Sequence, residues 1–237
     1  MKGCEEPNER TLRRLSLHPP SEVNPYTTHI HEHPSVLLAI PSPGRLREMM
    51  AAGIAGGLDL AVELGCGSGN FLVEMAARHP SMAFAGFELR YKRLVKAARK
   101  IERRGLKNAW LVRDLAERFP LYFEPESLSR VYLNFPDPWP KPSQWKHRLL
   151  NADFFTVLGR VLRPDGRFCF KTDHSGYLLH VLSILSHAPG WRIRAFHNDI
   201  QRSRLANLSV RSEFENLFRA MGKPVFYLEL DKAGATG

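Results

Sequence analysis

The sequence predicts an α/β fold: a mostly parallel sheet of seven strands, with helices on both faces and an antiparallel edge strand. From residue 58 onward, short apolar runs alternate with segments whose apolar residues recur at helical spacing. A glycine-rich turn, ELGCGSGN, joins the first apolar run to the first helical segment. The last two runs have no clear helix between them, so they are expected to pair antiparallel at one edge.

Residues 1–57 precede this regular pattern and are rich in Pro, His, Arg and Ser. They are expected to form a basic N-terminal arm with one helix near residues 45–52. Residues 58–237 are expected to form the main domain, because the strand and helix pattern starts there and runs nearly to the last residue.

Each expected element rests on its own local signal. The helix that begins at Tyr91 stops at Gly105, and the next helix starts at Asn151, a residue type favoured as an N-cap. A Pro-Asp-Gly turn at 164–166 separates that helix from the following strand. The expected helices are 70–79, 91–105, 151–163 and 176–190. The expected strands are 60–64, 82–89, 109–114, 130–135, 167–173, 191–196 and 224–230.

Composition excludes several classes of protein. No run of about 18 apolar residues predicts a membrane-spanning helix, and the N-terminus lacks the apolar segment of a secretory signal. Cys4, Cys66 and Cys169 lie far apart without a C-x-x-C pair, which argues against a disulfide framework or a zinc ribbon. We therefore expect a cytoplasmic protein without a membrane partner. The formal charge of +10 favours a polyanionic partner such as nucleic acid.

The glycine-rich turn predicts a ligand site. Gly65 and Gly67, with Gly69, let the backbone turn tightly and approach a ligand closely. Glu63 ends the preceding strand, and Glu88 ends the next strand at a spacing that suits a ribose diol. A carboxylate before the glycines repels a pyrophosphate but suits the ammonium and sulfonium groups of S-adenosylmethionine.

Asp114, at the end of the third strand, is placed to bond the adenine amino group of such a ligand. Open α/β sheets bind ligands at the carboxyl ends of their strands, where these three acids are expected. The alternative is that each acid only caps the end of its own strand.

The stretch NFPDPWPK follows the fourth strand and is a candidate for the loop that holds a reacting group. Its prolines end the strand and stiffen the loop, which places Asp137 between Pro136 and Pro138. A fixed carboxylate stabilises an acceptor that becomes cationic on methylation, and ring nitrogen 7 of guanine is such an acceptor. Trp139 is suited to stack on the base and Lys141 to meet a phosphate. The alternative is a stiff turn with a packed Trp.

The set ELGCGSG, GFEL, VYLNFPDPWPK, KTD and SEFE resembles the bacterial tRNA (guanine-N(7)-)-methyltransferase family over roughly residues 58–231. This resemblance implies a Rossmann-like class I methyltransferase domain at residues 58–237 that uses S-adenosylmethionine. The implied reaction is methylation of guanine nitrogen 7 in tRNA, usually at position 46 of the variable loop. Ser212 stands where the family usually has Thr, and residues 1–57 match the family poorly.

The resemblance also assigns roles to individual residues. Asp137 is the expected catalytic residue, at the junction of cofactor and guanine. With the glycines, the expected cofactor-binding set is Glu63, Gly65, Gly67, Glu88, Asp114 and Asp137. The expected tRNA-binding set is Lys141, Asp173, Ser212, Glu213, Phe214 and Glu215.

Two basic segments and a histidine-rich segment lie outside these motifs. The helix at 91–105 is expected to bury Leu94, Ala98 and Ile101 and to turn a row of cations outward, and a second basic cluster lies at 146–148. His29, His31 and His33 alternate, but no acid or cysteine completes a metal site, so we expect surface or packing roles and no metal. The helix cations expected to face outward are Lys92, Lys96, Arg99 and Arg103, and the second cluster is Lys146, His147 and Arg148.

Two other functions remain open at this point. One is a methyltransferase for another RNA base, an exocyclic amine or a small molecule; such an amine must lose a proton, unlike nitrogen 7 of guanine. The other is a non-catalytic RNA-binding module, which the acids at all the expected strand ends disfavour. The expected partner is tRNA, with the protein a monomer or a homodimer and no obligate protein partner.

Overall fold

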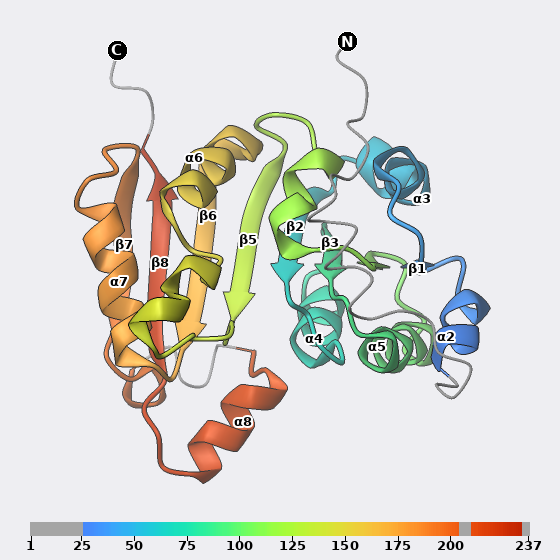
Figure 1. Cartoon of the computed structure of the whole chain (residues 1–237). Coiled ribbons are helices and arrows are strands. Elements are labelled where there is room, and N and C mark those ends of the chain that lie inside the picture. The colour runs from blue at the N-terminus through green and yellow to red at the C-terminus, as the bar shows by residue number, and fades with distance from the viewer. Residues whose placement is uncertain (1–25, 204–209, 234–237) are drawn as a thin grey trace. The chain divides into compact units, whose positions relative to one another are not determined.

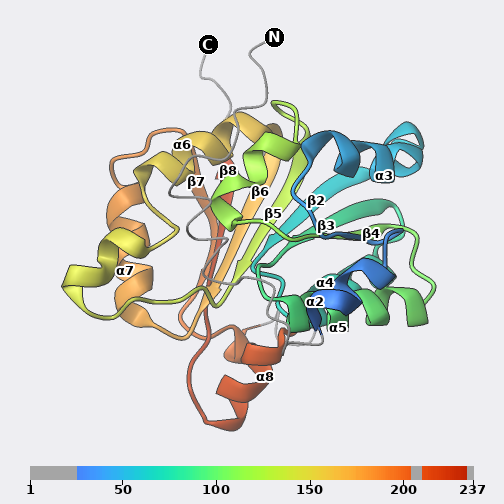
Figure 2. The same cartoon turned by 45° about the vertical axis from the view of Figure 1, so that its right-hand side comes forward.

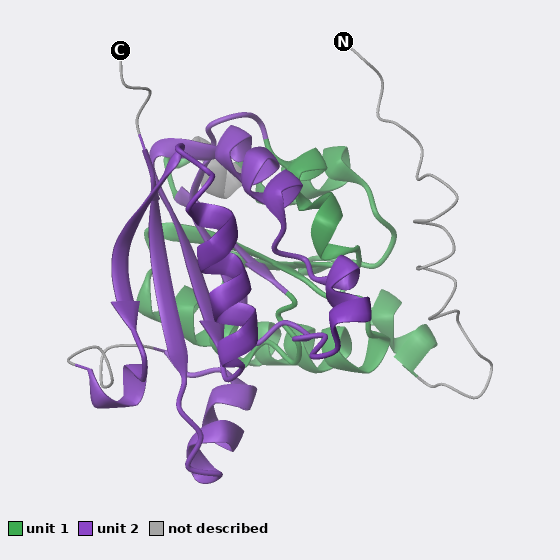
Figure 3. Cartoon of the chain, turned by 60° about the vertical axis from the view of Figure 1, so that its left-hand side comes forward, with its two compact units in different colours: residues 1–58, 65–123 green, residues 59–64, 124–237 purple. Residues whose placement is uncertain are grey.

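The computed structural model describes residues 26–203 and 210–233 of the chain. The chain forms two compact units, which Figure 3 colours separately. Unit 1 comprises Met1–Leu58 and Gly65–Phe123, and unit 2 comprises Asp59–Leu64 and Glu124–Gly237. The division into an arm at 1–57 and a domain at 58–237 stays a prediction, and residues 1–25 of that arm lie outside the described ranges.

Unit 1 is built on three parallel strands in which β4 pairs with β3 on one side and with β1 on the other. Every residue of β4 is buried, as expected for a strand that is covered on both faces. In this unit α3 lies on one side of the strands, and α4 and α5 lie on the other (Figures 1 and 2). The bounds are α2 Tyr26–His29, η1 Ile30–Glu32, β1 Leu37–Leu38, α3 Pro43–Ala55, α4 Asn70–Arg78, β3 Met82–Phe87, α5 Tyr91–Arg103, β4 Ala109–Val112 and η2 Ala116–Tyr122.

Unit 2 contains the parallel strands β2, β5 and β6, followed by β8 and β7, which pair antiparallel. Helices α6 and α7 pack on the same face of β6. Phe155 of α6 lies 6.0 Å from Phe168, and Tyr177 of α7 lies 5.6 Å from Phe170, between ring centroids. The bounds are β2 Asp59–Leu64, β5 Leu128–Asn134, η3 Pro142–His147, α6 Ala152–Val161, β6 Leu162–Thr172, α7 Ser175–Leu185, β7 Trp191–His197, η4 Ile200–Arg202, α8 Glu213–Ala220 and β8 Phe226–Lys232.

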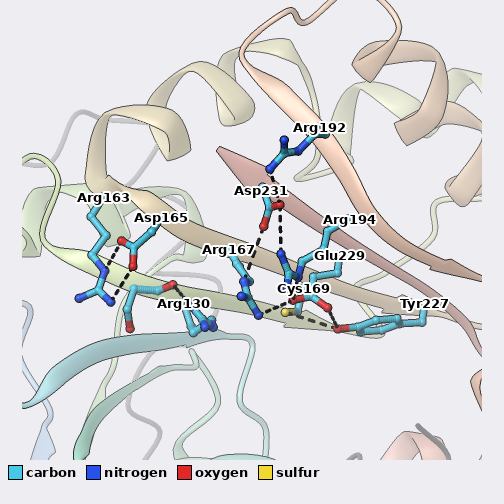
Figure 4. A network of polar contacts seen from close by, with 11 residues as sticks. Arg130, Arg163, Asp165, Arg167, Cys169, Arg192, Arg194, Tyr227, Glu229 and Asp231 are labelled. Atoms are coloured by element: carbon cyan, nitrogen blue, oxygen red, sulfur yellow. Dashed lines mark hydrogen bonds and ion pairs between the residues drawn. The ribbon is translucent and has the colours of Figure 1, made fainter. Parts of the chain in front are cut away.

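Three antiparallel-paired strands of unit 2, β6, β8 and β7, share a network of arginines and acids (Figure 4). Arg167 contacts Glu229 at 3.2 Å and Asp231 at 3.6 Å. Asp231 also pairs with Arg192 at 3.1 Å and with Arg194 at 3.4 Å. Although burial opposes ionisation, these two arginines lower the pKa of the Asp231 carboxyl. Asp231 therefore stays ionised among these arginines.

The predicted α/β class, the mostly parallel strands and the antiparallel edge are confirmed, but the number of strands is wrong. The described residues contain eight strands instead of seven. The extra strand, β1, has only two residues, which is too short to show an alternating pattern. The strand expected to start at residue 167 starts at Leu162 and includes the Pro-Asp-Gly segment. The pairing with β5 shifts register across that segment, as in a β-bulge.

Between the last two strands, the sequence was expected to form no helix, and the structure contains α8 there. Its N-terminus carries a signal that predicts a helix: Ser212 accepts a hydrogen bond from the backbone N–H of Glu215, at 3.1 Å. A serine followed three residues later by glutamate is the pattern of a capping box. This signal in SEFE was read only as a substrate motif.

Helix α5 has the two faces that its sequence predicts. Leu94, Ala98 and Ile101 are fully buried, and the four cations expected to face outward are exposed. Part of the outer face is covered within unit 1, because Arg99 pairs with Glu32 at 3.8 Å and Lys92 lies 5.7 Å from the ring centroid of Tyr26. Segment 26–33 therefore lies along the basic helix.

Two of the three histidines of that segment contact a glutamate. His29 Nδ1 lies 2.6 Å from Glu32 Oε1, and the buried His33 contacts Glu102 Oε2 at 2.7 Å, while His31 is exposed. In the part of the chain that the structure describes, no three His, Cys, Asp or Glu side chains gather as metal ligands. The described helices also include none whose length and apolar character would let it cross a bilayer.

Candidate functional site

The glycine turn of unit 1 adopts the conformation that its sequence predicts. Gly65, Gly67 and Gly69 have φ values of 70°, 56° and 75°, a left-handed region that favours glycine. The N–H of Cys66 donates to the carbonyl of Phe87 at 2.9 Å, so the turn is fixed against the end of β3. Helix α4 starts immediately after Gly69. Of the three glycines only Gly65 is exposed, so the turn presents the Gly65 backbone beside the strand that leads to Glu88.

Replacing Gly69 with alanine is expected to destabilise the protein by roughly 2 to 5 kcal/mol. The left-handed conformation costs an alanine roughly 1 to 2 kcal/mol, and overpacking adds roughly 1 to 3 kcal/mol. The overpacking arises because a Cβ on Gly69 would lie 2.8 Å from the Cβ of Ala97. Urea denaturation measures the loss. Gly105→Ala is the control, because Gly105 has a similar φ of 62° with nothing within 4 Å of its added Cβ. Equal losses in the two variants would show that the contact with Ala97 has no effect.

Glu88 and Asp114, the two predicted cofactor-binding acids of unit 1, follow the paired strands β3 and β4. The N–H of Glu88 donates to the carbonyl of Val112 at 3.1 Å, which places Glu88 beside the end of β4. Glu88 is half-exposed, and its Oε1 accepts hydrogen bonds from the N–H groups of Leu89 at 2.8 Å and Arg90 at 3.0 Å. The carboxylate therefore caps its strand, as the simpler alternative predicts, and remains within reach of a ligand.

Asp114 is more deeply enclosed than Glu88. One carboxylate oxygen accepts the N–H of Leu115 at 2.8 Å, and the other accepts Arg118 Nε at 3.0 Å and the Tyr122 hydroxyl at 2.7 Å. The side chain has 0% exposed surface. A direct bond to an adenine amino group would require one of these partners to move, so the adenine role of Asp114 stays a prediction.

In unit 2, Glu63 is linked to the proline-rich loop. Glu63 is buried near the end of β2, and Asn134 donates from Nδ2 to its Oε1 at 3.0 Å. Asn134 is the last residue of β5 and the first of NFPDPWPK. No role was predicted for Asn134, although the parallel pairing of β2 and β5 brings the end of β5 beside the end of β2.

The loop after β5 holds Asp137 in an exposed position between two strained residues. Phe135 and Trp139 have φ values of 52° and 43°, which are uncommon for residues with a side chain. Strain of this kind persists where the surroundings fix the backbone, and it is frequent at functional sites. The N–H of Phe135 donates to the carbonyl of Lys171 at 2.8 Å, and the Trp139 ring lies 5.1 Å from that of His147. Lys141 is exposed beyond them.

The SEFE motif divides into two inward and two outward side chains. Ser212 and Glu215 are buried, and Glu215 bonds Lys171 Nζ at 2.7 Å and Arg219 Nη2 at 2.7 Å. Glu213 and Phe214 are exposed on the first turn of α8. The inward pair therefore builds and anchors the helix. The outward pair lies at the surface, and its role in substrate binding stays a prediction. The sequence prediction did not assign Lys171 or Arg219.

Helix α8 and the KTD segment lie beside the loop of Asp137. Phe218 of α8 contacts Phe135, with ring centroids 5.3 Å apart. Asp173 is half-exposed and pairs with Lys223 at 3.3 Å. Unit 2 thus brings together Glu63, the loop, Asp173 and the late motif, while unit 1 brings together the glycine turn, Glu88 and Asp114.

Comparison with known proteins adds independent information. A family model described as "Putative methyltransferase" matches residues 59–228. A tRNA (guanine-N(7)-)-methyltransferase of Geobacillus kaustophilus is 36% identical over 196 residues, covering 80% of this chain and 87% of that protein. Another, of Geobacillus thermodenitrificans, is 36% identical and covers 71% and 77%. A bifunctional glycosyltransferase/methyltransferase of Fusobacterium nucleatum is 36% identical over 73% of this chain, which spans only 27% of that protein.

Solved structures show the same fold at lower sequence identity. An antibiotic-related methyltransferase has a TM-score of 0.60 at 19% identity, covering 85% of this chain and 98% of that chain. The 16S rRNA methyltransferase KamB also has a TM-score of 0.60, at 14% identity over 78% of this chain and 93% of that chain. At these identities the likeness shows the fold alone, which is that of Rossmann-like methyltransferases.

Proposed function

Because the chain belongs to the tRNA (guanine-N(7)-)-methyltransferase family, we propose that it transfers the methyl group of S-adenosylmethionine to nitrogen 7 of guanine in tRNA. The proposed target is the guanosine at position 46 of the variable loop. The observation that carries the proposal is the exposed carboxylate of Asp137, on a loop that contains two strained residues and is held by the bond from the Phe135 N–H to the Lys171 carbonyl.

The chemistry of guanine fits this loop. Nitrogen 7 has a lone pair and no proton, so its methylation needs no general base. The ring becomes cationic as the bond forms, and a fixed negative charge nearby stabilises that change. Asp137 supplies this charge and Trp139 supplies a flat surface against which a base can be aligned.

The predicted cofactor-binding residues suit S-adenosylmethionine by the chemistry of their groups. When bound, that cofactor supplies the methyl group on a sulfonium and accepts the electron pair of the broken carbon–sulfur bond. Gly65 is exposed with nothing within 4 Å of an added Cβ, so its backbone is open to close approach, and Glu88 is accessible to a ribose diol. Gly67 is covered by Arg93, whose Nη1 would lie 3.0 Å from an added Cβ. Glu63 and Asp137 contribute negative charge that suits a cationic donor. Asp114 completes the proposed set at the adenine.

The proposed tRNA contacts lie on exposed side chains. Lys141 is placed to meet a phosphate, and Glu213 and Phe214 extend from the start of α8. Asp173 joins this set, and Ser212 and Glu215 act by holding the helix. The formal charge of +10 favours association with a polyanion. A tRNA substrate also implies a cytoplasmic location, and no obligate protein partner is invoked.

Incubation with unmodified tRNA and methyl-labelled cofactor tests the proposal. We expect digestion and mass analysis to find label in 7-methylguanosine, within the fragment that carries the variable loop. Label in a methylated adenosine or in an exocyclic amine would assign a different acceptor. Absence of labelled nucleoside under conditions where the cofactor binds would contradict an RNA methyltransferase activity.

A further inference from the structure

Arg148 differs from the basic residues beside it. Lys146 and His147 are exposed, as expected for residues that meet RNA phosphates, whereas Arg148 has only 2% of its surface exposed. The sequence grouped the three as one basic cluster. A guanidinium withdrawn from solvent cannot reach a phosphate on the surface, so Arg148 needs another explanation.

The guanidinium of Arg148 is enclosed by aromatic rings and backbone carbonyls. It lies 4.6 Å from the ring centroid of Trp145 and 4.8 Å from that of Tyr177, within the range of a cation–π contact. Its Nε donates to the carbonyl of Pro138 at 2.9 Å, and its Nη2 donates to that of Trp139 at 3.4 Å. One rigid group therefore contacts two successive carbonyls of the loop that carries Asp137.

The enclosure of Arg148 holds the carbonyls of the two residues that directly follow Asp137 in the chain. Burial raises the pKa of Tyr177 to about 12, and the nearby negative charge of Asp137 adds to that rise. The Tyr177 hydroxyl in turn accepts the N–H of Leu150 at 3.1 Å, which fixes the end of the segment. Arg148 thus joins the loop to α7, an element that is packed against the sheet of unit 2.

Burial of the Arg148 guanidinium has an energetic cost. Burial lowers the pKa of Arg148, although a guanidinium stays protonated at neutral pH. The two carbonyls lie on either side of the Trp139 N–Cα bond, whose φ of 43° is strained. A planar fork can bind both carbonyls at once while its faces stack on rings, and a lysine ammonium cannot.

We propose that Arg148 is a positioning residue: it holds the Pro138 and Trp139 carbonyls so that Asp137 stays aligned with the acceptor base. This inference rests on the proposed function for its effect on turnover. Its effect on the loop itself is independent of that function. The residue acts through the backbone of the loop and does not touch tRNA.

The test compares Arg148→Lys with Arg160→Lys, an exposed arginine of α6 in the same unit. Single-turnover methyl transfer at saturating tRNA is expected to fall about 10- to 100-fold in Arg148→Lys, because misplacement by about 1 Å has effects of that size. Arg160→Lys is expected to match the wild type. The cofactor and tRNA dissociation constants of Arg148→Lys are expected to stay within about twofold of wild type, which separates positioning from binding.

Salt dependence distinguishes positioning from a phosphate contact. Removing one phosphate contact lowers the slope of log binding constant against log salt by roughly 0.7 to 0.9. Lys146→Ala is expected to show such a decrease, and Arg148→Lys is expected to keep the wild-type slope. A reduced slope in Arg148→Lys with unchanged saturated turnover would overturn the proposal and make Arg148 an RNA contact.

Hydrogen exchange gives a readout that does not depend on activity. The segment holds protected N–H groups, including Gln144 to the Lys141 carbonyl at 2.9 Å and Arg148 to the Trp145 carbonyl at 3.0 Å. Arg148→Lys is expected to speed exchange in peptides covering 135–150 and to leave α6 and β8 unchanged. Unchanged exchange in that segment would overturn the proposal, even if the wild-type protein formed no 7-methylguanosine.

A second variant covers the case in which Arg148→Lys does not fold. Trp145→Leu removes one face of the enclosure, and Trp145 is itself 43% exposed. It is expected to raise exchange in the same segment and to slow saturated turnover in the same direction, by roughly 3- to 10-fold, since a cation–π contact is worth about 1 kcal/mol. A Trp145→Leu enzyme with wild-type exchange and turnover would contradict the positioning role.

Discussion

Replacing Asp137 with alanine is expected to slow methyl transfer by about 100- to 1000-fold at saturating substrates, the size of effect seen when one preorganised electrostatic group is lost. Asp137 is exposed, and its loop is held by the Phe135 N–H bond and by the two carbonyl contacts of Arg148. Removing its carboxylate should therefore leave the fold intact. Rapid-quench measurement of 7-methylguanosine formation gives the rate, and calorimetry gives the cofactor affinity.

The control for this variant is Asp153→Asn, which removes an exposed carboxylate from the first turn of α6. It should turn over at the wild-type rate. Asp137→Asn is expected to fall close to Asp137→Ala, because an amide keeps the shape without the charge. Wild-type turnover in either Asp137 variant would remove the residue from the mechanism, and a loss confined to cofactor affinity would make it a binding residue only.

Replacing Glu215 with alanine is expected to lower the free energy of unfolding by roughly 3 to 5 kcal/mol, the usual cost of breaking a buried ion pair. The side chain of Glu215 has no exposed surface, and that of Lys171 is 5% exposed. Loss of the carboxylate leaves the ammonium buried, with the Val210 carbonyl at 3.1 Å as a remaining acceptor. It also removes the partner of Arg219 at 2.7 Å. Urea denaturation measures the change.

Two further variants show whether burial of the charge is the cause. Glu48→Ala breaks the exposed Arg45–Glu48 pair, in which the side chains are 60% and 66% exposed, and is expected to cost at most about 1 kcal/mol. Lys171→Met combined with Glu215→Leu replaces the ion pair by apolar groups and is expected to recover part of the lost stability. If Glu215→Ala lowers the free energy of unfolding by less than about 1 kcal/mol, burying the Lys171 ammonium without its carboxylate has little cost.

The sequence predicted the long elements well and the short ones poorly. Helix α5 was predictable because its buried residues recur every three or four positions and its cations fill the other face. Strand β1 was not, because two residues carry no period. The Pro-Asp-Gly segment reads as a turn, yet pairing with β5 and β8 draws the chain around it into one long strand. Tertiary pairing here overrides a local signal.

The candidate site shows a similar division. The left-handed glycines were predictable, because glycine adopts that conformation more readily than other residues. The exposure of Asp137 was predictable, because a charged residue in a proline-rich loop rarely lies in the core. Burial of single polar residues does not follow, because the neighbours that bury them come from distant segments. Lys171 meets Glu215 across 44 positions of sequence, and Arg148 lies between rings that are 32 positions apart. The sequence therefore could not separate Arg148 from Lys146.

The placement of β8 between β6 and β7 has a consequence for biogenesis. Strand β7 has no pairing with β6, and residues 226–232 supply the bridge between them. A nascent chain emerging from the ribosome therefore cannot complete this half of the sheet until those residues have left the exit tunnel. Until then one edge of β6 has unpaired backbone N–H and C=O groups. Such an edge can pair with other chains, and chaperones bind partly folded chains of this kind.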